Sequence, residues 1–218
     1  TLSITQNLID DDQTGSLERN FRNVMPAFQR HINNLAFTWL NGGDGTTYGT
    51  GPDALSLFNN SHKWPGAKNT TSQDNLYGSA LSLDNFNTVW VAAQQFVDDH
   101  SNYLNYNFNL LVTHPTNNVI AANITGNTQA MDTGNREMNP YAGQLSYITS
   151  PYLDTTAWVL VASSEMAKPI VVGVKKHPQL VNMWYDSQTE DGGTHYFQYH
   201  ARYNFVYGDW PLAIMGNS

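Results

Sequence analysis

The most regular hydrophobic pattern of the chain lies near its start, where apolar residues recur every three or four positions. The pattern begins at Leu17 and continues to Leu40, after which Asn41-Gly42-Gly43 interrupts it. This spacing predicts one long amphipathic helix with Ser16 as its N-cap. Pro26 lies inside the pattern, so we expect a kink or a missing backbone hydrogen bond at that point.

Shorter periodic stretches follow in the rest of the chain. Residues 83–99 have the spacing of a second helix, and residues 116–123 suit one or two further helical turns. Residues 1–15 suggest the end of a strand and a turn, whereas residues 54–80 and 125–143 have the composition of loops.

The remaining apolar and alternating segments predict strands. They cover residues 109–115, 144–149, 157–163, 169–175, 179–184 and 194–207. The last of these alternates aromatic and polar residues over an unusual length, which is typical of a long strand with one buried face. Strands and helices alternate without a βαβ rhythm, so the pattern predicts an α+β protein. The long helix near the start and the long strands near the end are expected to form one part, with the middle of the chain as a second.

The composition describes a surface that is polar but weakly charged. Charged residues make up 13% of the chain, about half of the ~25% that is usual. Such a surface suits extensive contact with neighbouring molecules, because burying an amide or a hydroxyl costs less than burying a charge. The net charge of −8 argues against nucleic-acid binding as the main function, since phosphate contacts need clustered basic residues. It is compatible with a protein that encloses nucleic acid without adhering to it.

Several classes of protein find no support in the sequence. The absence of cysteine excludes disulfides and thiolate metal sites. No apolar run approaches the length of a membrane span, and no signal peptide is recognisable. The glycine-rich loop at 42–53 lacks the Gly-Lys-Ser/Thr of a P-loop and is not preceded by a strand, as a dinucleotide-binding loop would be.

Candidate chemical groups are scattered. His195 and His200 are five residues apart, so on a strand they point to opposite faces and do not bind one ion together. The other histidines occur singly and are expected to be hydrogen-bonded or solvated: His31, His62, His100, His114 and His177. The carboxylate groups 10–12, 98–99 and 190–191 match no calcium loop, and no nucleophile motif is present. We therefore expect no catalytic, cofactor-binding or metal-binding residue and no cofactor, and the chain is not expected to be an enzyme.

A series of short motifs, in one order, resembles the major capsid proteins of tailed bacteriophages, with the Mu-type head subunits as the nearest group. The motifs are Leu57-Phe58 with His62, Asn75-Leu76, Leu81 to Phe86, Leu110 to Pro115, Asn139-Pro140, Ser150 to Leu153, Ala157 to Leu160, Lys168 to Val171, and Tyr203 to Pro211. Each motif alone is weak, but their common order over residues 16–211 is specific.

The resemblance implies the HK97-like capsid fold, which is α+β and has two subdomains. The peripheral domain, with a spine helix and long β-strands, is expected at residues 1–42 and 165–207. The axial domain is expected at 43–164, and the tail 208–218 is expected to return to it. Trp158 is expected to be a core residue where the chain leaves the axial domain.

The implied function is self-assembly into hexamers and pentamers of an icosahedral virion shell around double-stranded DNA. Acidic residues on the inner side would keep the DNA from adhering, and portal, scaffold and decoration proteins are the other expected partners. The family also has an N-terminal arm and an extended loop before the spine helix. Since the chain begins at Thr1, the arm and most of this loop are expected to be missing from it. Either the polypeptide is a fragment, which is the favoured alternative, or these parts are unusually reduced. Two alternatives remain open, an encapsulin-like protein compartment and a carbohydrate-binding or hydrolase domain.

Overall fold

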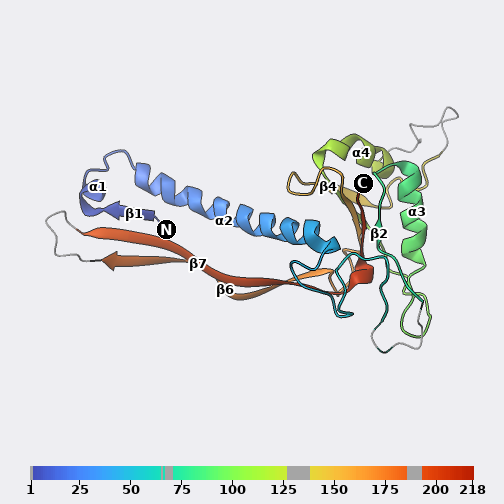
Figure 1. Cartoon of the computed structure of the whole chain (residues 1–218). Helices are drawn as coiled ribbons and strands as arrows, with labels where there is room; N and C mark the ends of the chain where they lie inside the picture. The colour runs from blue at the N-terminus through green and yellow to red at the C-terminus, as the bar shows by residue number, and fades with distance from the viewer. Residues whose placement is uncertain (1, 65, 67–70, 127–137, 186–192) are drawn as a thin grey trace. The chain divides into compact units, whose positions relative to one another are not determined.

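The computed structural model describes residues 2–64, 66, 71–126, 138–185 and 193–218. The chain forms two compact units. Unit 1 consists of Thr1–Leu35 and Val172–Phe205, and unit 2 consists of Ala36–Val171 and Val206–Ser218. Figure 1 labels the elements of both units. None of the described helices is long and apolar enough to cross a lipid bilayer.

Unit 1 combines the start of the chain with a long hairpin. Its elements are β1 (Leu2–Thr5), α1 (Gln6–Asp10), most of α2 (Ser16–Asn41), and most of β6 (Ile170–Tyr185) and β7 (Thr194–Tyr207). The strands form one sheet in the order β1-β7-β6. In it β1 is antiparallel to β7, with Leu2 opposite Phe197 and Thr5 opposite Thr194.

Unit 2 is built on a five-stranded mixed sheet in the order β2-β8-β5-β3-β4. The strands are β2 (Leu76–Tyr77), β3 (Leu110–Thr113), β4 (Ser146–Thr149), β5 (Trp158–Val161) and β8 (Ala213–Gly216). The pairs β3–β5 and β5–β8 are antiparallel, whereas β3–β4 and β2–β8 are parallel. Unit 2 also contains α3 (Leu83–Gln94), α4 (Asn118–Gly126), and the 3-10 turns η1 (Gly42–Asp44), η2 (Pro115–Asn117) and η3 (Trp210–Leu212).

One hydrophobic core fills unit 2. It includes the fully buried side chains of Phe58, Phe86, Phe108, Trp158 and Trp210. Trp158 on β5 has no exposed surface, and its indole N–H donates to the carbonyl oxygen of Ser79 at 3.0 Å. The expectation that Trp158 is a core residue is therefore confirmed.

The long helix predicted from the first apolar pattern is confirmed as α2, which is 26 residues long. Pro26 lies inside α2 without ending it, at the cost of one backbone hydrogen bond. The predicted N-cap at Ser16 is wrong by one residue. Ser16 is already helical, and the carbonyl of Gly15 accepts the N–H of Arg19. The carboxylate of Asp12 accepts the N–H of Ser16 at 3.2 Å and so supplies the capping acceptor.

The predicted helix at 83–99 begins where expected but ends earlier. The side chain of Ser82 accepts the N–H of Asn85, which caps the start of α3, and the helix ends at Gln94. Phe96, expected on the helix face, is buried from the following loop and packs edge-on against Trp210. Tertiary packing of this ring therefore outweighs the helical periodicity.

Most predicted strands are present, with two differences. The segments 169–175 and 179–184 form the single strand β6, which continues through Pro178. A proline is tolerated there because β6 lies at the edge of its sheet, where one side of the backbone has no partner strand. The apolar tail was not expected to be a strand, yet β8 pairs with both β2 and β5. Of the loop predicted at 125–143, residues 127–137 lie outside the described residues.

Candidate functional site

A buried asparagine connects three separate segments of unit 2. The side chain of Asn75, at the start of β2, has no exposed surface. Its amide nitrogen lies 2.9 Å from the carbonyl oxygen of Leu57 and 3.1 Å from those of Trp210 and Ala213. Its side-chain oxygen accepts the N–H of Asn59 at 2.8 Å. Asn75 therefore fixes the loop 54–62 and the segment 210–213 to one another.

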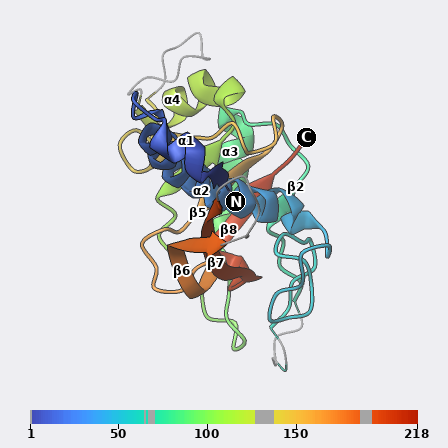
Figure 2. The same ribbon diagram turned by 90° about the vertical axis from the view of Figure 1, so that its left-hand side faces the viewer.

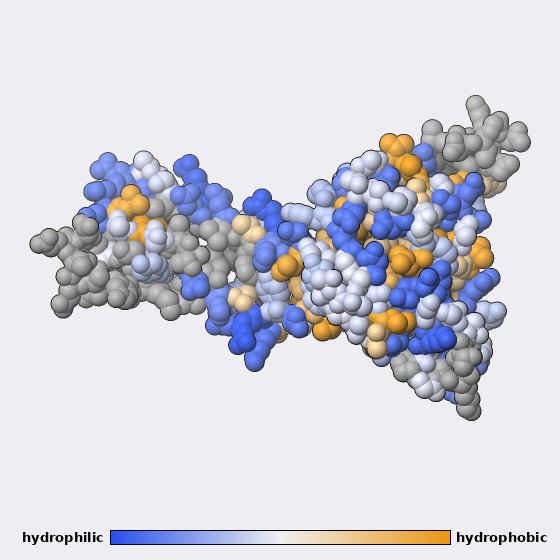
Figure 3. All heavy atoms as spheres, in the orientation of Figure 1, coloured by the Kyte–Doolittle hydropathy of each residue, from blue (hydrophilic) through white to orange (hydrophobic). Residues whose placement is uncertain are grey.

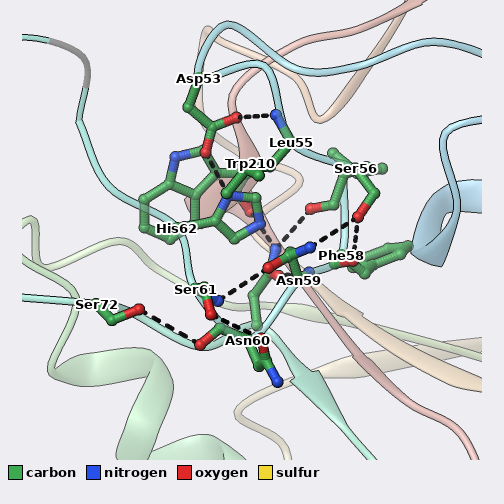
Figure 4. A network of polar contacts seen from close by, with 12 residues as sticks. Asp53, Leu55, Ser56, Phe58, Asn59, Asn60, Ser61, His62, Ser72 and Trp210 are labelled. Carbon is green, nitrogen blue, oxygen red and sulfur yellow. Dashed lines mark hydrogen bonds and ion pairs between the residues drawn. The ribbon is translucent and has the colours of Figure 1, made fainter.

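His62 lies in the same loop and completes the connection (Figure 4). Its imidazole is fully buried and stacks on the indole of Trp210, with ring centroids 4.4 Å apart and planes parallel. Nδ1 lies 2.5 Å from a carboxylate oxygen of Asp53, and the other oxygen of that carboxylate accepts the N–H of Leu55. Backbone hydrogen bonds in both directions pair His62 with Gln73. We name this group, Asp53, His62, Asn75 and Trp210, the polar node.

The polar node contains a histidine–carboxylate pair, which in enzymes can activate a nucleophile. Here the second ring nitrogen of His62, Nε2, is buried and has no hydrogen-bond partner among the described residues. A substrate would need access to that atom, and both side chains of the pair are at most 3% exposed. The pair is therefore suited to holding loops together and not to proton transfer with a ligand. The expectation that His62 is hydrogen-bonded is confirmed.

The polar node gives a physical reason for several of the sequence motifs. Leu57 and His62, Asn75, and Trp210 belong to three of the motifs, and contacts of the node bring them together. Sequence reasoning treated Asn75 and Trp210 only as parts of motifs and predicted no contact between them. No local pattern in the sequence distinguishes these two residues, since Asn75 follows Asp74 and Trp210 follows Asp209.

A second polar cluster is an exposed turn after α3. The Asp98 carboxylate accepts the backbone N–H groups of His100 and Asn102, each at 2.8 Å. Hydrogen bonds from the Asn102 side chain and backbone lower the pKa of Asp98. The imidazole Nδ1 of His100 lies 2.7 Å from Asp99, and this hydrogen bond and charge raise the pKa of His100 above its usual 6.5.

The acidic turn holds three possible metal-ligand atoms close together. The acidic turn is the segment from Asp98 to Asn102. One ligand atom of Asp98, one of Asp99 and one of His100 lie within 4.8 Å of one another. These groups are open to solvent, with side chains of Asp99 and His100 exposed to 52% and 61%, and their hydrogen bonds within the turn account for their positions. The arrangement assigns no metal to the turn.

The other candidate residues do not gather in one place. His31, His177 and His200 are exposed on α2, β6 and β7. His114 accepts the N–H of Thr116 and caps η2. The side chain of His195 and the pair Glu190-Asp191 lie outside the described residues.

An open cavity of about 600 Å³ lies beside the acidic turn. Gln73, Asp74, Tyr77, Phe96 and Tyr103 contribute to its lining. The amide of Gln73 is occupied at both ends, since it donates to the carbonyl and accepts the N–H of Val97. Burial and the nearby Asp74 charge raise the pKa of Tyr77. The cavity is thus lined by groups that stabilise the loop, and none of them selects a cofactor.

Exposed apolar side chains occur on the outside of both units, interspersed with polar ones (Figure 3). In unit 2 they include Val91 on α3, Val119 and Ile120 on α4, and Ile148 on β4. The densest group among the described residues is on β6, where Val171, Val172 and Val174 are all at least 40% exposed. Such positions suit contact with other protein surfaces better than chemistry.

Comparisons with known proteins give one family match and several matches to solved structures. The sequence matches the family described as "Phage capsid protein" over residues 1–213. No curated protein gives a significant match. Among solved structures, the chain is similar to the capsid of bacteriophage JBD30, decorated with minor capsid protein trimers. That match has a TM-score of 0.56 and 14% identity, over 70% of this chain and 72% of the other.

Two further structural matches cover 99% of this chain. A structure from Mycobacterium phage Patience has a TM-score of 0.61 at 12% identity, and the match spans 66% of that chain. The SrpI encapsulin of Synechococcus elongatus has a TM-score of 0.54 at 10% identity, and the match spans 70% of that chain. At these identities the structural matches establish a common fold.

Proposed function

Because the chain belongs to the phage capsid protein family, we propose that its copies form hexamers and pentamers of an icosahedral head that encloses double-stranded DNA. The chain is a structural component of the phage capsid, and its location is the virion. Its fold is the HK97-like capsid fold, an α+β arrangement. The observation that carries the proposal is the family match, because it extends over residues 1–213 and so includes both units.

We propose that unit 1 is the peripheral domain and unit 2 the axial domain of this fold. Unit 1 contains most of the long helix α2 and of the long strands β6 and β7, which correspond to the spine helix and the peripheral sheet. Unit 2 contains the middle of the chain and the C-terminal strand β8, as the axial domain would.

The interior of unit 2 supports a building-block role. Its core is continuous, and the polar node uses buried side chains to lock its loops. A rigid subunit loses little conformational entropy when it associates, which favours assembly of many copies. Contacts between two different surfaces of such subunits form a closed ring when the repeated rotation from one neighbour to the next returns to the first subunit.

Partners and closer relatives are part of the same proposal. The ordered motifs favour the Mu-type head subunits as the nearest group within the family. Portal, scaffold and decoration proteins are the expected partners, and the JBD30 capsid is a related fold that is itself decorated with minor capsid protein trimers.

Assembly of the full chain tests the proposal. Purified protein is followed by size-exclusion chromatography and negative-stain microscopy over a range of concentrations and salt conditions. Rings and closed shells are the expected products. A protein that stays monomeric under all these conditions, also with its scaffold and upstream residues present, would contradict the proposal.

The contents of the particle separate a phage head from an encapsulin-like compartment. Particles isolated from producing cells are treated with nuclease, and the protected material is then analysed. Double-stranded DNA of uniform length supports a phage head, whereas a folded protein cargo without DNA supports a compartment.

A further inference from the structure

The strands β6 and β7 carry basic but no acidic residues, although the chain as a whole is acidic and the residues between the strands include Asp186, Glu190 and Asp191. Residues 168–185 and 193–207 contain no Asp or Glu, while the chain has 18 acidic residues and a net charge of −8. The same two segments hold four of the ten basic residues, namely Lys168, Lys175, Lys176 and Arg202. Among the described residues, Lys175, Lys176 and Arg202 form no ion pair. The two strands therefore carry positive charge that has no ion-pair partner in the described part of the chain.

Apolar side chains lie directly beside these charges. Val171, Val172 and Val174 are exposed to 44%, 40% and 46%. Because neighbouring residues of a strand point to opposite faces, Val171 and Val172 show that both faces of β6 are open there. β6 is also an edge strand, with β7 on its other side (Figures 1 and 2). A two-stranded ribbon open on both faces is marginally stable by itself, so a covering partner would stabilise it.

We propose that residues 171–176, here called the β6 strip, bind the acidic turn Asp98–Asp99 of a second copy of this chain. This inference rests on the proposed shell function and names one contact within the shell. It fits the charge distribution, because unit 2 holds 11 acidic and 4 basic residues, a net charge of −7. Opposite charges on the two surfaces steer the copies together and fix their register.

The acidic turn matches the β6 strip in both charge and apolar character. Asp99 is 52% exposed, and Tyr103, which is bridged to Val97 at the base of the turn, is 71% exposed. The Asp98 carboxylate already orders the turn through the N–H groups of His100 and Asn102, so little entropy is lost on binding. An exposed aromatic ring next to a carboxylate thus faces valines next to lysines.

Nucleic acid is the other polymer that a basic strip could bind. Phosphate contacts use Lys, Arg and polar groups and gain nothing from half-exposed valines. The three valines between and beside the charges therefore favour a protein surface as the partner. DNA binding remains a distinct outcome in the experiment below.

The experiment exchanges the charges in the full chain. Lys175→Glu and Asp99→Lys are each compared with the wild type and with the control Lys63→Glu, which reverses an exposed lysine outside the β6 strip. Asp98 is left unchanged because it holds the turn together. The subunit concentration needed for assembly is measured by light scattering and sedimentation at low and physiological salt, and far-UV circular dichroism establishes that each variant is folded.

Each single exchange is expected to raise the required concentration by about tenfold, since one unfavourable pair at an interface costs roughly that factor. The control is expected to stay within about threefold of the wild type on the same scale. The combined variant K175E/D99K restores an opposite-charge pair between copies, so its assembly is expected to return close to the wild-type concentration.

Four outcomes would overturn the inference. They differ in whether the proposed shell function is also contradicted. Unchanged assembly of Lys175→Glu alongside normal wild-type shells overturns the contact but keeps the shell function. Loss of assembly without rescue in the combined variant overturns the pairing with Asp99. Weaker binding of Lys175→Glu to a duplex DNA fragment, with normal assembly, assigns the strip to nucleic acid. Failure of the wild type to assemble removes the proposed function itself.

Discussion

Asn75 shows how one polar side chain can organise a region that has little regular structure. Its amide group satisfies carbonyl oxygens from residues 18, 135 and 138 positions away in the chain. Removing a donor from buried carbonyl oxygens costs free energy, and the carbonyl of Trp210 would keep only the backbone N–H of Ala213. The residue therefore substitutes for strand pairing in the loops before β2.

Replacing Asn75 with Ala is expected to lower the free energy of unfolding by about 2–5 kcal/mol, because several hydrogen bonds of about 1 kcal/mol each are lost and buried carbonyls remain. Urea unfolding followed by tryptophan fluorescence measures the change. Asn85→Ala is the control, since the Asn85 amide donates only to the exposed carbonyl of Ala80. The two variants should differ clearly; equal effects would mean that the polar node contributes no special stability.

His100 in the acidic turn is expected to titrate with a raised pKa. The hydrogen bond and charge of Asp99 raise the pKa of His100 above 6.5. The stabilising contribution of the pair is therefore complete below pH 6.5 and is lost as the pH rises through the pKa of His100 in the folded chain. NMR titration of the His100 ring is expected to give a midpoint above 6.5. In Asp99→Asn the midpoint should fall; an unchanged midpoint would rule out Asp99 as the cause.

At the scale of elements, β8 is the strand that joins β2 to the rest of the sheet of unit 2. It lies between β2 and β5, and all four of its residues are buried. Gly216 is required at its end, because a Cβ at this position would overlap the indole ring of Trp158. The tail thus contributes both pairing and close packing.

Gly216→Ala is expected to destabilise the chain by about 1–3 kcal/mol, since the added carbon overpacks the core against a ring that has no free space. Thermal unfolding measures the effect. Gly126→Ala is the matched control, because nothing lies within 4 Å of a Cβ built on Gly126. Should both variants unfold at the same temperature, close packing at Trp158 would not be the constraint on Gly216.

The elements differ in how far the sequence predicts them. The helix α2 and the strand β7 are long enough for their periodicity to dominate, and both were predicted within a residue or two. β8 has four buried residues and therefore no alternation to recognise. The contacts of Asn75 and His62 with the segment 210–213 were not predictable, because they join residues more than a hundred positions apart whose proximity depends on the finished sheet.

At the scale of the whole molecule, the described side chains of the two units differ in their burial. The continuous core lies entirely within unit 2. Among the described residues of unit 1, Ile4 and Phe205 are the buried hydrophobic side chains. Residues 171–175 of β6 and His200, Arg202 and Asn204 of β7 are exposed. Since exposed stretches of a sheet open more easily than buried ones, we expect this hairpin to be less protected than β5 in an isolated subunit.

Hydrogen exchange of the unassembled protein is expected to be faster in unit 1 than in unit 2. Amides of residues 196–204 in β7 should exchange at least about tenfold faster than those of β5, which corresponds to a difference of about 1.4 kcal/mol in local opening. After assembly the difference should shrink, because neighbouring copies then cover the hairpin. Equal protection in both units of the free subunit would contradict this division.

The position of β8 has a consequence for the timing of synthesis. The chain leaves the ribosome from its N-terminus, and β8 is the last of the described strands to emerge, yet β2 and β5 both depend on it. A polypeptide whose translation stops before residue 213 cannot complete the sheet of unit 2, and Trp210 and Asn75 then lack their surroundings. Prematurely terminated products would stay unfolded and be degraded, so they would not be incorporated as defective subunits in a growing particle.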